Sequence, residues 1–159
     1  MKPQMLLTGF LISMFGEFIQ VWSFASLVKN EELTARGPYV MVRNPMYLGR
    51  YFLVLGVIIL PGNIYIVAIY TVFYYFYMVN RVKREESRLA KILGQPYQDY
   101  CQRTNPFWPT FSRLFNKDVW FWSWRVCFMN NGHWNFLSAI IVWVVVYGYL
   151  NYFSLLFGG

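Results

Sequence analysis

The sequence predicts an all-α integral membrane protein with about four transmembrane helices, a helical hairpin and interfacial amphipathic helices. Composition is the first reason. Of the 159 residues, 57% are hydrophobic and 13% are charged, whereas soluble domains carry about 25% charged residues. The second reason is that the apolar residues lie in long runs separated by basic segments, as in membrane proteins. The length suits a single domain over residues 1–159.

Four apolar runs are the candidate membrane spans. The first covers residues 5–28 and the last covers residues 134–157, and each is about long enough to cross a bilayer. Residues 46–60 and 64–80 flank the turn Pro61-Gly62-Asn63, which predicts a helical hairpin. Both hairpin runs are short for a bilayer core about 30 Å thick. Either the bilayer thins there or the helices extend beyond the apolar limits, and a hairpin that stops short of the far side is the less favoured alternative.

The first run leaves two questions open. Lys2 precedes it, as in a signal peptide, but the run is too long for a signal core and no clear Ala-x-Ala cleavage site follows it. Glu17 lies in the middle of the run. Because a carboxylate is costly inside a membrane, Glu17 is a candidate functional residue. The alternative is a protonated Glu17 that is hydrogen-bonded to a neighbouring helix.

The basic residues predict the orientation in the membrane. The net charge is +7, and of the 14 Lys and Arg residues only Lys2 lies away from two polar loops and the adjoining Arg50. These loops are residues 29–45 and 81–133. The positive-inside rule places both loops in the cytosol and both termini on the other side. We expect a bacterial inner membrane or endoplasmic reticulum protein whose active site faces the cytosol, with no nucleic-acid partner.

The second loop contains further predicted elements. Residues 81–93 are expected to continue the third helix out of the membrane and to lie near the headgroups, and Gly94-Gln95-Pro96 ends that helix. Residues 119–129 are typical of an interfacial aromatic belt. The two cysteines and the lone His133 form neither a metal-ligand pattern nor a disulfide framework, so no metal is expected.

The densest polar motif is residues 36–50, directly against the second apolar run. Pro38 and Pro45 mark turns, and Pro45 suits the first turn of a helix because its missing N–H is not needed there. The free N–H groups of such a helix start favour an anion or the carboxylate of a ligand. Gly49 would allow close approach of another backbone or a ligand. The alternative is a plain helix start with basic residues at the membrane surface.

A second polar cluster comprises Arg81, Glu85 and Glu86, just beyond the third run. Arg81 and Glu85 are four residues apart and share one face of the predicted helix. Lys and Arg anchor a helix end at the cytosolic face better than acids do. The two acids could instead hold a cationic amine or a sulfonium, or position a nucleophile. A solvated face of salt bridges is the alternative.

Together, the two clusters resemble a known family. The motifs that carry the resemblance are Gly37-Pro38-Tyr39, Val42-Arg43-Asn44-Pro45-Met46-Tyr47-Leu48-Gly49, Leu55-Gly56, Arg81-x-x-x-Glu85-Glu86, Leu89, Gly94-x-x-Tyr97-x-x-Tyr100 and an aromatic segment at Pro106 and Pro109. Over roughly residues 35–110 the chain is similar to the integral-membrane methyltransferases, which include isoprenylcysteine carboxyl methyltransferases and phospholipid N-methyltransferases. The family commonly has His where this chain has Asn44, and Asn-Pro-Met-Tyr resembles the phospholipid-methylating branch.

The resemblance implies S-adenosylmethionine as methyl donor, S-adenosylhomocysteine as product and a lipid or lipid-linked acceptor. Phospholipid amine N-methylation is favoured over O-methylation of a prenylcysteine-type carboxyl. The implied cofactor-binding residues are Tyr39, Arg43, Asn44, Pro45, Tyr47, Leu48, Gly49, Glu85 and Glu86. The implied catalytic residues are Arg81, Glu85 and Glu86, with both acids by the methionine end of the cofactor. Because Asn is not a base at neutral pH, a mechanism that needs His at position 44 is not expected.

Two other function classes stay open at this point. Sterol-reductase-like membrane enzymes that use NADPH have a similar Pro-x-Tyr-x-Gly region, and such an enzyme would need a basic pocket for the cofactor phosphate. A non-catalytic membrane adaptor could use the aromatic and basic surface to bind anionic lipid. Binding of a small-molecule cofactor separates these classes. The sequence leaves open the acceptor, the oligomeric state and the role of residues 111–159.

Overall fold

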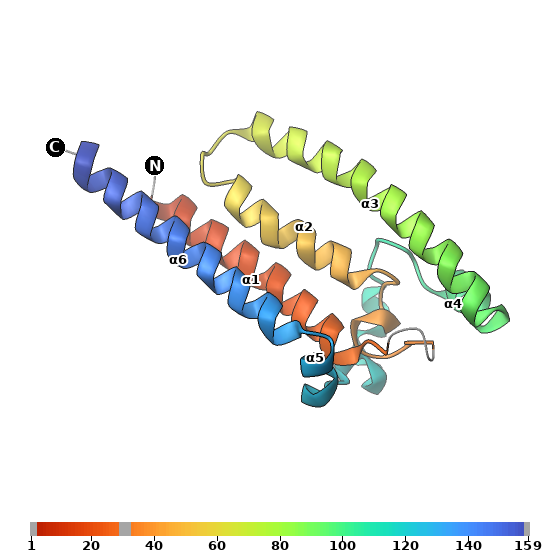
Figure 1. Cartoon of the computed structure of the whole chain (residues 1–159). Coiled ribbons are helices and arrows are strands. Elements are labelled where there is room, and N and C mark those ends of the chain that lie inside the picture. Colours follow the sequence, from red (N-terminus) through yellow and green to blue (C-terminus); the bar gives the residue numbers. More distant parts are fainter. Residues whose placement is uncertain (1–2, 29–32, 158–159) are drawn as a thin grey trace.

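The computed structural model describes residues 3–28 and 33–157, which form helices and irregular segments without a strand (Figure 1). The long helices are α1 (Pro3–Ser26), α2 (Pro45–Ile58), α3 (Ile64–Leu93) and α6 (Gly132–Phe157). The short elements are the 3₁₀ helices η1 (Gly37–Val40), η2 (Phe111–Phe115) and η3 (Lys117–Trp120), and the α-helices α4 (Gln95–Arg103) and α5 (Trp124–Met129). The predicted all-helical class is therefore confirmed. Lys2 and residues 29–32 of the predicted first loop lie outside the described residues.

The long helices run side by side, and the two termini lie at one end of the molecule while the short elements gather at the other (Figure 1). Among the described residues, two helices are long and apolar enough to cross a membrane, over Gln4–Ser26 and Gly132–Tyr152. Helix α2 is apolar but has 14 residues, which is about 21 Å at a rise of about 1.5 Å per residue. The structure therefore supports two of the four spans, and the number four stays a prediction.

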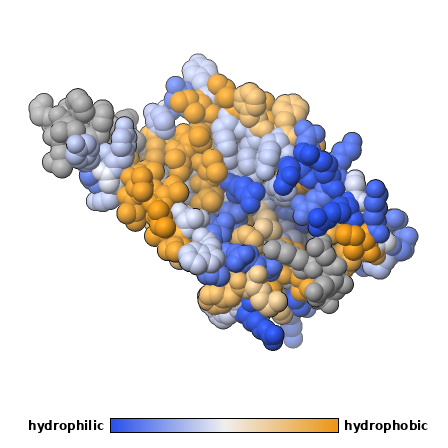
Figure 2. Space-filling view, viewed as in Figure 1, coloured by the Kyte–Doolittle hydropathy of each residue, from blue (hydrophilic) through white to orange (hydrophobic). Residues whose placement is uncertain are grey.

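Helix α3 continues without interruption from the apolar run into the polar region, as predicted. It has 30 residues, and Asn63 caps its start by accepting a hydrogen bond from the Tyr65 backbone N–H at 2.9 Å. Gly94 ends it with a φ of 61°, a conformation that glycine adopts without strain. Figure 2 shows that hydrophilic side chains gather over the C-terminal half of α3, whereas apolar side chains cover much of α2 and α6.

Backbone-to-backbone contact joins α1 to α2. A Cβ atom added at Gly16 would lie 2.4 Å from the Leu53 nitrogen, and one at Gly56 would lie 2.2 Å from the Gly9 oxygen. Small residues allow membrane helices to approach this closely. The Ser13 hydroxyl also donates to the Leu53 carbonyl at 2.7 Å. Helix α2 is thus held directly against α1.

Longer side chains join α1 to α6. Glu17 of α1 is 1% exposed, and both of its carboxyl oxygens accept from the Asn135 amide, at 2.8 and 2.9 Å. The Phe10 and Trp143 rings meet edge to face with centroids 5.4 Å apart. Glu17 therefore has the hydrogen bond to a neighbouring helix that its structural interpretation, as opposed to a functional one, predicts.

The predicted aromatic belt, residues 119–129, folds into η3 and α5 beneath the end of α1. Val119 and Cys127 are buried, whereas Trp120 and Trp124 are exposed. The Asn130 amide closes this region by donating to two carbonyls at the end of α1, Phe24 at 2.9 Å and Leu27 at 2.7 Å.

Candidate active site

The motif loop, defined as residues 36–44, is fixed by a segment that lies far away in the sequence. The Arg43 N–H donates to the Asn105 carbonyl at 2.8 Å, and the Thr110 N–H donates to the Met41 carbonyl at 2.9 Å. The Arg113 guanidinium donates to the Val40 carbonyl at 3.0 Å. Residues 104–113 therefore hold the loop that leads into α2.

Asn44 connects the motif loop to α3. It is the N-cap residue of α2, and Pro45 follows in the first turn as predicted. The Asn44 side chain makes no capping hydrogen bond, and its amide nitrogen donates to Glu86 Oε1 and to the Pro106 carbonyl, each at 3.2 Å. The Arg43 Nε lies 3.5 Å from the same Glu86 oxygen, an ion pair that is not aligned as a hydrogen bond. Asn44 and Arg43 together orient Glu86.

Tyr47 makes the second connection between the two polar clusters. Its hydroxyl donates to Glu85 Oε2 at 3.0 Å, and its backbone carbonyl accepts from the Tyr74 hydroxyl at 2.6 Å. Hydrogen bonding with the Tyr47 phenol is the largest cause that raises the pKa of Arg81. The two clusters, separated in the sequence by the hairpin, therefore meet at the polar end of the molecule.

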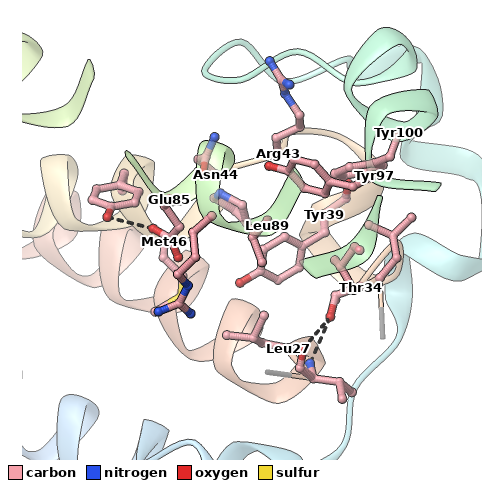
Figure 3. A pocket seen from close by; sticks show the side chains of 16 residues that line it. Leu27, Thr34, Tyr39, Arg43, Asn44, Met46, Glu85, Leu89, Tyr97 and Tyr100 are labelled. Carbon is pink, nitrogen blue, oxygen red and sulfur yellow. Dashed lines mark hydrogen bonds between the residues drawn. The ribbon is translucent and has the colours of Figure 1, made fainter. Parts of the chain in front are cut away.

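A cavity of about 280 Å³ lies where these elements converge. Figure 3 shows Glu85 and Leu89 of α3, Tyr39 and Asn44 of the motif loop, and Thr34 around it. Of the residues predicted to bind the cofactor, those that line this cavity are Tyr39, Arg43, Asn44, Pro45, Tyr47 and Glu85. The volume is just below the range of about 300–1,000 Å³ typical of small-molecule sites.

The other predicted site residues lie elsewhere. Leu48, Gly49 and Arg81 are not among the lining residues of this cavity, and Glu86 lines a second groove that adjoins it at Arg43 and Tyr97. Gly49 faces α1, because an added Cβ would lie 2.7 Å from the Gly16 oxygen. Gly49 thus allows the close approach of a backbone, which is one of the two roles its position suggested.

Buried tyrosines form one wall of the cavity. The Tyr100 hydroxyl donates to the Tyr39 carbonyl at 2.7 Å, and both residues are buried. Burial, with smaller effects of Tyr100 and Glu85, raises the pKa of Tyr39 well above its usual range. Its phenol is therefore a neutral hydrogen-bond donor at physiological pH. Charged side chains of both signs also line the cavity, Arg43 and Arg88 against Glu85.

Sequence reasoning named Met46, Leu89, Tyr97 and Tyr100 as motif residues but assigned no site role to them or to six other lining residues. Together these are Leu27, Val28, Leu33, Thr34, Met46, Arg88, Leu89, Leu93, Tyr97 and Tyr100. Leu89 and Leu93 follow Glu85 at intervals of four, which places them on one face of α3. This spacing could have predicted them. The end of α1 carries no comparable signal. It joins the site through the Thr34 hydroxyl, which accepts from the Val28 N–H at 3.0 Å.

The fold and the site define an all-helical protein with apolar helices and a cavity at its polar end. Residues 5–96 match the family model of phospholipid methyltransferases. This match covers more than half of the chain, and the chain therefore belongs to that family, as its motifs predicted. The match includes α1 and ends within α4. Neither the curated proteins nor the solved structures contain a significant match.

The family makes the chain a membrane methyltransferase. The two apolar helices agree with a membrane location. Nothing in the comparisons or in the structure favours the membrane reductase or the non-catalytic adaptor that the sequence left open.

Proposed function

We propose that this chain transfers a methyl group from S-adenosylmethionine to the amine of a phospholipid at the cytosolic membrane face. The observation that carries the proposal is the convergence of the motif loop, the start of α2 and Glu85 of α3 on one cavity. Carboxyl O-methylation is less favoured, because this chain has the Asn-Pro-Met-Tyr sequence typical of the phospholipid-methylating branch.

The residues around the cavity match the groups of S-adenosylmethionine. The positive end of the α2 dipole, at Pro45, and the Arg43 guanidinium suit a carboxylate. Arg43 Nε is buried and has no hydrogen-bond partner among the described residues, so an acceptor on a ligand would satisfy it. The Glu85 carboxylate, oriented by Tyr47, suits a positive group such as a sulfonium.

When bound, the cofactor supplies an electrophilic methyl group on a positively charged sulfur. The protein then has to orient the acceptor and exclude water. The C–S bond breaks as the N–C bond forms, and the products are S-adenosylhomocysteine and the methylated amine. The amine must first lose a proton, and a nearby carboxylate can accept it. Arg81, which lies beside Tyr47, would orient the Tyr47–Glu85 pair.

The first test is calorimetric binding of S-adenosylhomocysteine to the purified protein in detergent, with NADPH in parallel. We expect saturable binding of S-adenosylhomocysteine alone. Binding of NADPH alone would support the reductase, and binding of neither to folded protein would support the adaptor.

Glu85→Gln sharpens this test, because S-adenosylmethionine carries a positive charge on its sulfur and S-adenosylhomocysteine does not. We expect the variant to lose about tenfold more affinity for S-adenosylmethionine than for S-adenosylhomocysteine, which corresponds to about 1.4 kcal/mol. Tyr75→Phe, an exposed position on α3, is the control and should bind both normally. Unchanged affinity of Glu85→Gln for both ligands would contradict the site.

A further inference from the structure

The groove that contains Glu86 is separate from the site cavity and has a volume of about 520 Å³. It lies between α3, α4 and the segment at Pro106 and Phe107. Its lining residues include Arg43, Val79, Lys83, Glu86 and Tyr97. Arg43 and Tyr97 line both the groove and the site cavity. The two spaces therefore share a wall.

The chemistry of the groove changes in a fixed order along α3. Val79 belongs to the apolar run that is predicted to lie in the membrane, Lys83 follows one turn later, and Glu86 follows after almost another turn. Residues three and four apart lie on the same helix face. From the membrane outward, the groove thus presents an apolar side chain, a cation and a carboxylate.

A phospholipid with an amine headgroup carries its groups in the same order. Its acyl chains lie in the membrane, its phosphate lies at the surface, and its amine lies further out by a short carbon bridge. We infer that this groove binds such a headgroup, with Lys83 contacting the phosphate and Glu86 contacting the amine. This inference rests on the proposed function and assigns the acceptor to a place distinct from the cofactor cavity.

The surroundings of Glu86 suit an amine ligand. The hydrogen bond from Asn44 and the ion pair with Arg43 both engage Oε1. In the part of the chain that the structure describes, neither contact uses Oε2, and Glu86 remains partly exposed. A carboxylate that is held at one oxygen can accept hydrogen bonds from an ammonium group at the other.

The same arrangement brings the amine to the edge of the cofactor cavity, where Arg43 and Tyr97 line both spaces. Asn44, which orients Glu86, also lines the cofactor cavity. The ammonium gives one proton to the Glu86 carboxylate, which releases it to water, and the free amine then takes the methyl group as the C–S bond breaks. Lys83 takes no part in this chemistry and acts as a specificity residue that recognises the phosphate.

Lys83 can be tested by pairing two acceptors with two forms of the protein. The acceptors are phosphatidylethanolamine and a long-chain primary amine without phosphate, both in mixed micelles, with methyl transfer from labelled S-adenosylmethionine as the readout. We expect Lys83→Gln to lower kcat/KM for phosphatidylethanolamine about tenfold, mainly through KM, because a charged hydrogen bond is lost. For the phosphate-free amine, kcat/KM should be unchanged. Lys83→Arg should restore most of the activity on the phospholipid.

Lys91→Gln is the matched control, since it removes a positive charge from the same helix at an exposed position that lines neither space. It should leave both acceptors unaffected. Equal losses on both acceptors in Lys83→Gln, or no loss on either, would overturn the assignment of Lys83 to the phosphate. Methyl transfer to a carboxyl lipid with none to either amine would overturn the groove as an amine site while the methyltransferase function stands. Failure of S-adenosylhomocysteine to bind would instead contradict the proposed function itself.

Discussion

Helix α1 packs against its two neighbours in opposite ways. Against α2 the contact is between backbones, with Gly16 and Gly56 at the points of closest approach. Against α6 the contact is between large side chains, with one buried polar pair, Glu17 and Asn135. The first interface lies within the family match and positions the motif loop, whereas α6 lies beyond the match. The difference indicates that the α1–α2 spacing serves the site and tolerates little change, while the α1–α6 contact serves stability.

The largest effect is expected from Gly16→Leu. An added Cβ would lie within 3 Å of backbone atoms of Gly49, Phe52 and Leu53, none of which can move independently of α2. Overpacking of this kind costs about 1–3 kcal/mol or more. We expect a clear fall in the thermal midpoint in detergent and loss of S-adenosylhomocysteine binding.

The control for this change is Gly148→Leu on α6, where no atom of the described part of the chain lies within 4 Å of an added Cβ. It should alter the free energy of unfolding by no more than about 0.5 kcal/mol. Similar midpoints for the two variants would show that the α1–α2 interface is not closely packed in solution.

The sequence predicted the backbone of the site better than its side-chain geometry. Proline and glycine signals placed the hairpin turn, the start of α2 at Pro45 and the end of α3 at Gly94, because these residues restrict the backbone locally. The motifs identified the family. The contacts of Asn44 with Glu86 and Pro106 were not predictable, since they join segments whose separation depends on the whole fold.

The adjacent acids show where the sequence analysis could have gone further. Glu85 and Glu86 were predicted to lie together by the cofactor, yet they line different spaces. Successive residues on an α-helix point about 100° apart, because a turn contains about 3.6 residues. The helix was predicted, so the divergence of the two side chains followed from it. The position of the motif loop relative to these two side chains did not follow from the helix alone.

The second prediction concerns the polar pair between α1 and α6. Asn135→Leu leaves the buried Glu17 without its hydrogen-bond donor, and we expect a loss of about 1–3 kcal/mol in the free energy of unfolding. The double variant Glu17→Met with Asn135→Leu removes both polar groups and should recover most of that loss. Thermal unfolding in detergent measures all three proteins. A double variant that is less stable than Asn135→Leu alone would indicate that Glu17 has a further partner or function.

A smaller effect is expected where a segment outside the family match supports the motif loop. Tyr100→Phe removes the hydroxyl that donates to the Tyr39 carbonyl and leaves this buried acceptor unpaired. We expect a loss of about 1 kcal/mol in stability and a fall of less than about tenfold in affinity for S-adenosylhomocysteine, because Tyr39 lines the cavity. Tyr75→Phe, on the exposed surface of α3, should change neither quantity. A loss of stability without any loss of affinity would show that this hydrogen bond supports the motif loop but not cofactor binding.

The smallest effect is expected for Trp143→Phe, and Trp22→Phe provides the comparison. Trp143 of α6 is 5% exposed, and among the described residues no acceptor reaches its buried indole N–H. Trp22 of α1 instead donates its indole N–H to the Phe121 carbonyl at 3.2 Å. The same substitution therefore removes an unpaired polar group in one case and a hydrogen bond in the other.

Trp143→Phe loses ring area but also removes the cost of a buried unpaired N–H, so the two effects offset each other to within about 1 kcal/mol. The edge-to-face contact with Phe10 is available to Phe as well. Trp22→Phe loses area and leaves the Phe121 carbonyl with one donor fewer, so it should be the more destabilised variant. Thermal midpoints in the same detergent decide the order. A larger loss for Trp143→Phe would contradict the interpretation that its buried N–H is unpaired.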